Sequence, residues 1–125
     1  MLTGKKILLV DDDERNIFAL TAVLKSKGPT MISAKDGIDC LEKLRDHADV
    51  DLVLLDMMMP EMDGYQSLKE IRSDEKLKHL PVISLTAQAM KGDLEKCLAA
   101  GANDYCSKPV DVNLLLGKIK TLLSL

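Results

Sequence analysis

The sequence has few aromatic residues. It contains no tryptophan, and its aromatic side chains are those of Phe18, Tyr65 and Tyr105. We therefore expect a core built from leucine, isoleucine, valine, methionine and alanine. Hydrophobic residues still make up 46% of the chain and charged residues 30%, which is the composition of a folded globular protein and not of a disordered one.

Long apolar segments are also lacking, since no run approaches the roughly 20 residues that a transmembrane helix needs. Lys5 and Lys6 are followed by only four apolar residues before the first acids, so we expect no secretory signal peptide. The cysteines, Cys40, Cys97 and Cys106, are odd in number and lack metal-ligand spacing. These features predict a cytoplasmic protein without membrane insertion, in which the thiols are reduced and structural.

An excess of positive charge is absent as well. The formal net charge is -3 and the isoelectric point is near 5.3, so we expect no direct binding to nucleic acid. The length of 125 residues suffices for one core, and no repeat or low-complexity segment divides the chain. The sequence therefore predicts a single domain over residues 1–125.

Short apolar runs alternate with helical patterns. Unbroken runs such as KKILLV and VDLVLLD are typical of strands covered on both faces, whereas Ile17, Leu20, Val23 and Leu24 have helical spacing. The expected strands are 5–10, 30–34, 50–55, 80–87 and 103–109, and the expected helices are 14–27, 38–47, 64–73, 92–102 and 111–125. This alternation predicts an α/β fold with a parallel five-stranded sheet and helices on both faces.

Polar residues stand where these strands end. They are Asp11 and Asp12 after the first strand, Asp56 at the third, Thr86 at the fourth and Lys108 after the fifth. In parallel sheets, functional groups gather beyond the carboxyl ends of the strands. We therefore expect these residues, although far apart in the sequence, to meet at one rim of the sheet.

Carboxylates that share one cleft raise one another's pKa unless a cation is present. Mg2+ suits such a cleft, because it binds one or two carboxylates and keeps other positions for water and phosphate. Asp11, Asp12 and Asp56 thus form a candidate metal site. We interpret the neighbouring Asp13 and Glu14 as solvated acids at a helix N-terminus, where negative charge is favourable.

Asp56 is a candidate either for a metal ligand or for a nucleophile, since an aspartate carboxylate can attack phosphorus. Phosphoryl transfer depends mainly on positioning and on charge neutralisation. Lys108 could neutralise the phosphoryl oxygens as a point charge, and Thr86 offers a hydroxyl donor. Each of these residues alone is weak evidence for a phosphoryl-transfer site. Their joint placement at the strand ends is what supports this prediction.

Several stretches of this sequence form a recognisable set: ILLVDDDERN, DLVLLDMMMPEMDGY, VISLTA, GANDYCSKP and the closing helix. With them, the chain resembles the receiver domain of two-component response regulators over essentially its whole length. The segment LLDMMMPEMDG is the most specific part of this resemblance. The resemblance implies a flavodoxin-like (βα)5 three-layer sandwich with strand order 2-1-3-4-5.

The resemblance also implies a role for each acid at the rim. Asp56 would be the phosphoacceptor, Asp12 the direct metal-ligating acid, and Asp11 its partner, which often acts through water. The backbone carbonyl of Met58 would be a further ligand of Mg2+, and Mn2+ is an alternative ion.

Other residues would bind the phosphate or respond to it. The resemblance implies that Thr86 is the switch hydroxyl, that Ala87 contributes its backbone, and that Lys108 binds the phosphate. The Lys108–Pro109 peptide would be cis, as X-Pro bonds can be. Tyr105 matches an aromatic switch position, although from the sequence alone it is equally a half-buried strand aromatic.

Pro60 and Gly64 would shape the loop after Asp56, and Gly64 could simply supply a turn. Two further positions, occupied by Met58 and Gln88, vary in the family and tune the lifetime of the phosphate. Because the Met58 side chain cannot orient an attacking water well, we expect a phosphorylated state of moderate to long life.

The partners implied are a sensor histidine kinase or a histidine phosphotransfer domain, and a downstream protein or an attached output domain. Phosphorylation would reshape the face made by the fourth helix, the fifth strand and the fifth helix, and self-catalysed hydrolysis would reset it. The alternative is a pseudo-receiver, a scaffold that binds proteins without being phosphorylated. The sequence does not identify the kinase or the target.

Overall fold

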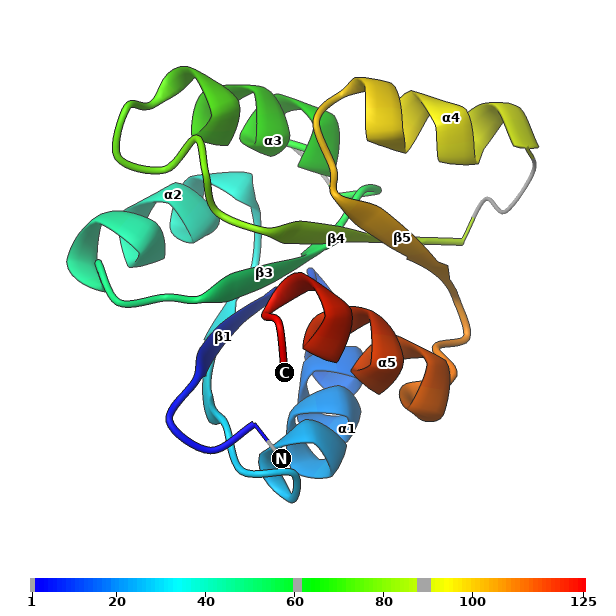
Figure 1. Cartoon of the computed structure of the whole chain (residues 1–125). Helices are drawn as coiled ribbons and strands as arrows, with labels where there is room; N and C mark the ends of the chain where they lie inside the picture. The colour runs from blue at the N-terminus through cyan, green and yellow to red at the C-terminus, as the bar shows by residue number, and fades with distance from the viewer. Residues whose placement is uncertain (1, 60–61, 88–90) are drawn as a thin grey trace.

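The computed structural model of the protein describes residues 2–59, 62–87 and 91–125 (Figure 1). The strands in these ranges are β1 (Lys6–Val10), β2 (Thr30–Ala34), β3 (Leu52–Asp56), β4 (Val82–Thr86) and β5 (Asp104–Ser107). The helices there are α1 (Glu14–Lys25), α2 (Gly37–Asp46), α3 (Gly64–Ser73), α4 (Lys91–Ala99) and α5 (Val112–Leu122). The predicted alternation of strands and helices is confirmed for the described part of the chain.

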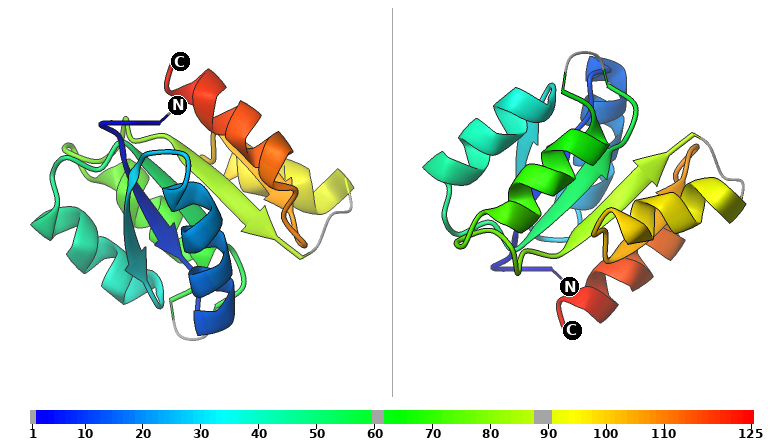
Figure 2. Two further views of the ribbon diagram at one scale, coloured as in Figure 1. Left: turned by 90° about the horizontal axis from the view of Figure 1, so that it is seen from below. Right: turned by 90° about the horizontal axis from the view of Figure 1, so that it is seen from above.

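The strands form one parallel sheet in the order β2-β1-β3-β4-β5. Helices α1 and α5 cover one face of this sheet, and α2, α3 and α4 cover the other (Figures 1 and 2). The central strands β3 and β4 are buried at every position, because both of their faces lie under helices. The three-layer, flavodoxin-like architecture with this strand order is therefore confirmed.

Aliphatic side chains form the core on both faces of the sheet. On the α1/α5 face, Ile7 and Leu9 belong to the same cluster as Ile119, whereas Leu8 of the opposite face joins Ile71 of α3. Cys40 and Cys97 belong to the core on the α2/α3/α4 face, and Cys106 belongs to the core on the α1/α5 face. All three cysteines are free and buried. The expected aromatic-poor core is what the structure has, since its buried hydrophobic residues include no aromatic side chain within the described ranges.

Some element boundaries differ from the sequence-based expectation. The third strand starts at Leu52 and not at Val50; just before it, the Asp51 carboxylate accepts a hydrogen bond from the Lys6 backbone N–H at 2.8 Å. Among the apolar residues of α1 that have helical spacing, Val23 is 40% exposed, and Leu24 is the fully buried residue of that turn. None of the described helices has the length and apolar character that crossing a bilayer requires.

Aspartate side chains cap several helices at their N-termini. The caps are Asp13 for α1, Asp36 for α2, Asp63 for α3 and Asp111 for α5. Asp13 accepts a hydrogen bond from the backbone of Arg15 at 2.9 Å, which satisfies one of the free N–H groups of the first turn. The interpretation of Asp13 as a helix N-terminal acid therefore holds.

A single guanidinium ties together the loops that lead into β4 and β5. Arg72 of α3 donates to the backbone oxygens of Lys78, Leu80 and Gly101 at 3.1, 2.7 and 2.9 Å, respectively. It also donates to the Asn103 side chain at 2.8 Å. We call this group the Arg72 clamp. Because these loops precede the strands, the clamp lies at the amino-end rim of the sheet.

Candidate functional site: an acid pocket at the carboxyl-end rim

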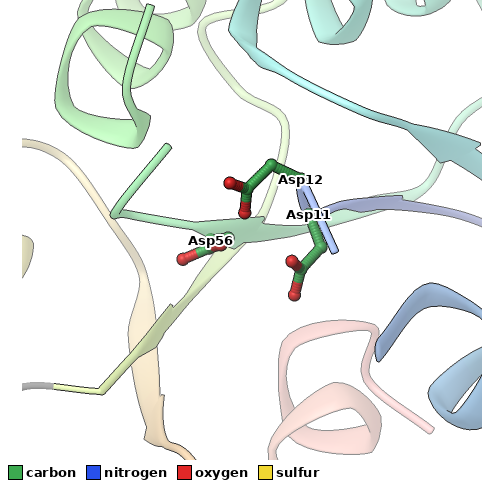
Figure 3. A group of neighbouring side chains, drawn as sticks. All are labelled: Asp11, Asp12 and Asp56. Carbon is green, nitrogen blue, oxygen red and sulfur yellow. The ribbon is translucent and has the colours of Figure 1, made fainter. Parts of the chain in front are cut away.

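The carboxyl ends of β1 and β3 bring three aspartates together. Asp11 and Asp12 directly follow β1, and Asp56 is the last residue of the neighbouring strand β3. One carboxylate oxygen of each aspartate lies within 4.8 Å of a carboxylate oxygen of the other two (Figure 3). Asp11 and Asp56 are 2% and 3% exposed, whereas Asp12 is exposed and faces solvent.

Each buried carboxylate is held in the same way by the chain that follows it. The backbone N–H of Asp13 donates to Asp11 Oδ1 at 2.9 Å, and that of Met58 donates to Asp56 Oδ1 at 3.0 Å. In both cases the donor lies two residues after the acid, where the chain turns away from the strand. One oxygen of each carboxylate is thus fixed, and the other points into the pocket.

Lys108 supplies the cation between these two acids. Its Nζ lies 3.1 Å from Asp11 Oδ2 and 3.3 Å from Asp56 Oδ2. The backbone of Lys108 is anchored beside β4, since its N–H donates to the Thr86 carbonyl at 2.8 Å. The peptide bond between Lys108 and Pro109 is cis. Residues almost a hundred positions apart therefore meet at this rim, which we call the acid pocket.

The charges in the acid pocket do not balance: among the described residues it gathers three carboxylates, and the Lys108 ammonium pairs with two of them, those of Asp11 and Asp56. Burial raises the pKa of Asp56, and the hydrogen bond from Met58 and the attraction of Lys108 oppose this rise. Burial alone would lower the pKa of Lys108, but its hydrogen bond with Asp11 and the charge of Asp56 raise it. An added cation would relieve the excess of negative charge.

The donor set of the acid pocket fits a hard divalent cation. Asp11, Asp12 and Asp56 offer carboxylate oxygens, which are the ligands that Mg2+ prefers, and the exposed side of Asp12 leaves access for water. No nitrogen or sulfur ligand of the kind that Zn2+ favours belongs to this group among the described residues. The residues present are therefore consistent with the magnesium site expected from the sequence.

The remaining predicted residues that fall within the described ranges are Thr86, Ala87, Tyr105 and Met58. Thr86 ends β4 and is buried, and Ala87, which follows it, is exposed. Tyr105 is half-buried on β5, and the centroid of its ring lies 4.6 Å from Lys118 Nζ. Met58 has a 54% exposed side chain beside Asp56. Gln88 and Pro60 lie outside the described residues.

Two glycines support the loop after Asp56, and only one of them was expected from the sequence. A Cβ on Gly64 would lie 2.6 Å from the Asp56 carbonyl oxygen and from Met57 Cα, so close packing, and not a special turn conformation, requires this glycine. A Cβ on Gly37 would lie 2.6 Å from the Met62 carbonyl oxygen. Sequence reasoning missed Gly37, because its contact joins α2 to a loop that is distant in the chain.

Comparison with known proteins identifies a family with this fold. The family model of the response regulator receiver domain matches residues 7–120. The polar-differentiation response regulator DivK of Brucella ovis is 36% identical over 119 residues, which are 95% of this chain and 96% of that protein.

Solved structures give the same result. A putative response regulator from Chloroflexus aurantiacus has a TM-score of 0.91 and 31% identity, covering 97% of this chain and 98% of its own. A chain of the CheX-CheY-BeF3-Mg complex from Borrelia burgdorferi has a TM-score of 0.88 and 30% identity, covering 96% of this chain and 90% of its own. The protein therefore belongs to the receiver-domain family of two-component response regulators.

Proposed function

We propose that the protein accepts a phosphoryl group on Asp56 from the phosphohistidine of a sensor histidine kinase or a histidine phosphotransfer domain. The observation that carries the proposal is the position of Lys108 Nζ between the buried carboxylates of Asp11 and Asp56. An ammonium in this position can meet the oxygens of a phosphoryl group that arrives at Asp56. Family membership supports the same reaction.

The transfer exchanges one bond to phosphorus for another. A carboxylate oxygen of Asp56 forms the new P–O bond, and the P–N bond of the donor histidine breaks with its electron pair left on the imidazole. The Met58 N–H holds Asp56 Oδ1, which orients the carboxylate for attack. Lys108 neutralises charge on the phosphoryl oxygens, and the Thr86 hydroxyl and the Ala87 backbone offer further donors.

Asp11, Asp12, Asp56 and the backbone carbonyl of Met58 are the residues that would hold Mg2+, or Mn2+ in its place. When bound, the divalent ion would neutralise charge on the phosphoryl oxygens. Asp11 would also position Lys108 in this arrangement, because its Oδ2 accepts a hydrogen bond from Lys108 Nζ. The chain thereby holds the lysine and the metal-binding acids in one connected group.

The output of the proposed reaction is a change of surface shape. Thr86 would move toward the new phosphate, Tyr105 would turn inward behind it, and the face formed by α4, β5 and α5 would change. A downstream protein or an attached output domain would read this face. Residues 1–125 are proposed to act as one receiver domain in either arrangement.

Phosphorylation with a small-molecule donor tests the proposal. The protein is incubated with acetyl phosphate and Mg2+, and its intact mass is measured. We expect an added phosphoryl group that is absent from Asp56→Asn and present in a matched control, Asp74→Asn, which changes an acid of the distant α3 C-terminus. No adduct in the parent protein would favour the alternative function, a pseudo-receiver scaffold.

The lifetime of the phosphorylated state is a separate part of the proposal. Met58 lies beside Asp56 with an exposed side chain that has no strong hydrogen-bonding group to orient an attacking water. We expect Met58→Asn to change the decay rate of the phosphorylated protein, and identical decay of the two proteins would remove this idea. Gln88 is proposed as the second residue that tunes the lifetime.

A further inference from the structure

We infer that Lys118 is a positioning residue for Tyr105: it holds the tyrosine ring in its present half-exposed position and so opposes the inward turn. This inference rests on the proposed function, in which Tyr105 moves when the acid pocket is phosphorylated. Lys118 belongs to α5, and Tyr105 belongs to β5, which is the edge strand of the sheet next to β4.

The backbone of Tyr105 is paired by side chains and not by a neighbouring strand. Its N–H donates to Asp104 Oδ1 at 2.8 Å, and its carbonyl accepts from Lys118 Nζ at 2.5 Å. In a strand, the N–H and C=O of one residue point to the same side, so both groups of Tyr105 face the open edge. At Tyr105, the side chains of Asp104 and Lys118 therefore take the place of a neighbouring strand as hydrogen-bond partners of the backbone.

The two side chains also bind each other. Lys118 Nζ lies 3.2 Å from Asp104 Oδ1, the same oxygen that accepts the Tyr105 N–H. Their side chains are only 20% and 33% exposed, so the ammonium is held in a defined place. From that place it lies 4.6 Å from the centroid of the Tyr105 ring, within the range of a cation–π contact.

These two kinds of contact respond differently to movement of the ring. The hydrogen bond to the Tyr105 carbonyl does not depend on the side-chain rotamer. The cation–π contact exists only while the ring stays near Lys118, so it stabilises the present position and not the inward one. A ligand-controlled equilibrium shifts only through such differential contacts. A cation–π contact corresponds to roughly a twofold to thirtyfold change in that equilibrium.

The residue beside Tyr105 on the neighbouring strand is small. Ser84 of β4 is the register partner of Tyr105, and alternation of side chains places both on the α2/α3/α4 face of the sheet. Ser84 is fully buried, and its small side chain carries a hydroxyl without a hydrogen-bond partner among the described residues. With a small residue beside the ring, the contact with Lys118 becomes an important restraint on its position.

Fluorescence of the ring gives a direct test. The sequence has no tryptophan and two tyrosines, so in a Tyr65→Phe background the tyrosine emission comes from Tyr105 alone. Acrylamide quenching then measures how exposed this ring is. The reference change is the decrease in quenching when the background protein is saturated with Mg2+ and beryllofluoride, which imitates the phosphoryl group.

Three substitutions separate the ring contact from the backbone contact. Lys118→Met removes both, Lys118→Gln keeps a hydrogen-bond donor but removes the cation, and Lys118→Arg keeps both. Lys120→Met is the matched control, because Lys120 is an exposed lysine of the same helix. Without any phosphoryl analogue, we expect reduced quenching for the Met and Gln variants and unchanged quenching for the Arg variant and the control.

The Met and Gln variants should also need less beryllofluoride for the half-maximal response, by twofold or more, since the inward state is already more populated. If Lys118→Gln behaved like the parent while Lys118→Met differed, the backbone bond alone would matter and the inference would be wrong. It would also be wrong if neither variant changed although beryllofluoride protected the ring in the background protein. If beryllofluoride did not protect that ring, the proposed switch role of Tyr105 would itself fail.

Discussion

The two rims of the sheet hold charged side chains in opposite ways. At the amino-end rim, the guanidinium of Arg72 meets four oxygen acceptors, three of them backbone carbonyls. At the carboxyl-end rim, three carboxylates lie together, and the ammonium group of Lys108 contacts two of them. The first cluster pairs its donors with neutral oxygens, whereas the second keeps an excess of negative charge.

This difference separates a polar cluster whose charge is paired within the protein from one that is suited to bind a cation. The Arg72 clamp is complete without any ligand, so its hydrogen bonds contribute to the folded state as they stand. In the acid pocket, burial raises the pKa of Asp56, and the nearby charge of Asp11 adds to this rise. We expect this arrangement to lower the stability of the fold until a cation is bound. The following predictions test this contrast.

The largest effect is expected at the clamp. Arg72→Met should lower the free energy of unfolding by about 3 kcal/mol, because it leaves backbone oxygens of two loops without their donor. Urea unfolding followed by circular dichroism measures this loss. Arg45→Met, on the exposed side of α2, is the control and should be nearly neutral. A small loss in Arg72→Met would mean that water replaces the guanidinium.

A divalent ion should stabilise the acid pocket and leave the clamp unaffected. At a Mg2+ concentration a hundred times the dissociation constant, the gain in the free energy of unfolding is about 2.7 kcal/mol. Asp12→Asn should remove most of this gain, whereas Asp13→Asn should keep it, because Asp13 caps α1. Thermal unfolding at several Mg2+ concentrations gives the result, and equal gains in both variants would place the ion elsewhere.

Without a divalent ion, removing a charge from the pocket should increase stability. Asp56→Asn is expected to raise the free energy of unfolding at neutral pH by about 1 kcal/mol, since it removes a charge whose burial is the main cause of the raised pKa of Asp56, and also removes the repulsion with Asp11. Glu42→Gln, on the exposed side of α2, should show no such gain. If Asp56→Asn were destabilised, the buried acids would not lower the stability of the parent protein, and the prediction would be wrong.

The sign of the pH dependence follows from the raised pKa of Asp56. The folded protein binds the proton more tightly than the unfolded chain, so this group makes the protein more stable as the pH falls through its folded pKa. The advantage of Asp56→Asn over the parent should therefore shrink between neutral pH and the ordinary carboxyl range. Urea unfolding at a series of pH values without divalent ions measures the difference.

The smallest effect is expected for a cation that lies near the same rim but in solvent. Arg15 contacts Asp13 Oδ2 at 3.3 Å with a side chain that is 92% exposed. Exposed ion pairs contribute little, so Arg15→Met should leave the unfolding midpoint unchanged. A clear loss of stability would show that charge pairing near this rim matters even without burial.

The fold and the members of the acid pocket could be predicted because they depend on short-range patterns. Each strand is a short apolar run, and the rule for parallel sheets places the residues at their ends along one rim. Asp11, Asp56 and Lys108 could be brought together in this way without coordinates. The interpretation of Asp13 as a helix N-terminal acid followed from its position before a helical pattern.

The remaining features depend on which side chains meet across the fold. The Arg72 clamp joins α3 to two loops, and the sequence around Arg72 contains no sign of its four acceptors. The contact of Lys118 with Tyr105 requires the position of α5 beside the sheet edge. Val23 has the spacing of a core residue, but the part of α1 that faces the sheet is narrower than the apolar pattern.

The three buried thiols have a practical consequence. Cys40 and Cys97 are fully buried and Cys106 is 2% exposed, and burial is the main cause that raises the pKa of Cys40 to about 12. Because alkylating reagents react with an accessible thiolate, the native cysteines should remain unlabelled in the folded protein. A single cysteine introduced at an exposed position such as Leu98 of α4 could then carry a spin label or a dye without a cysteine-free background.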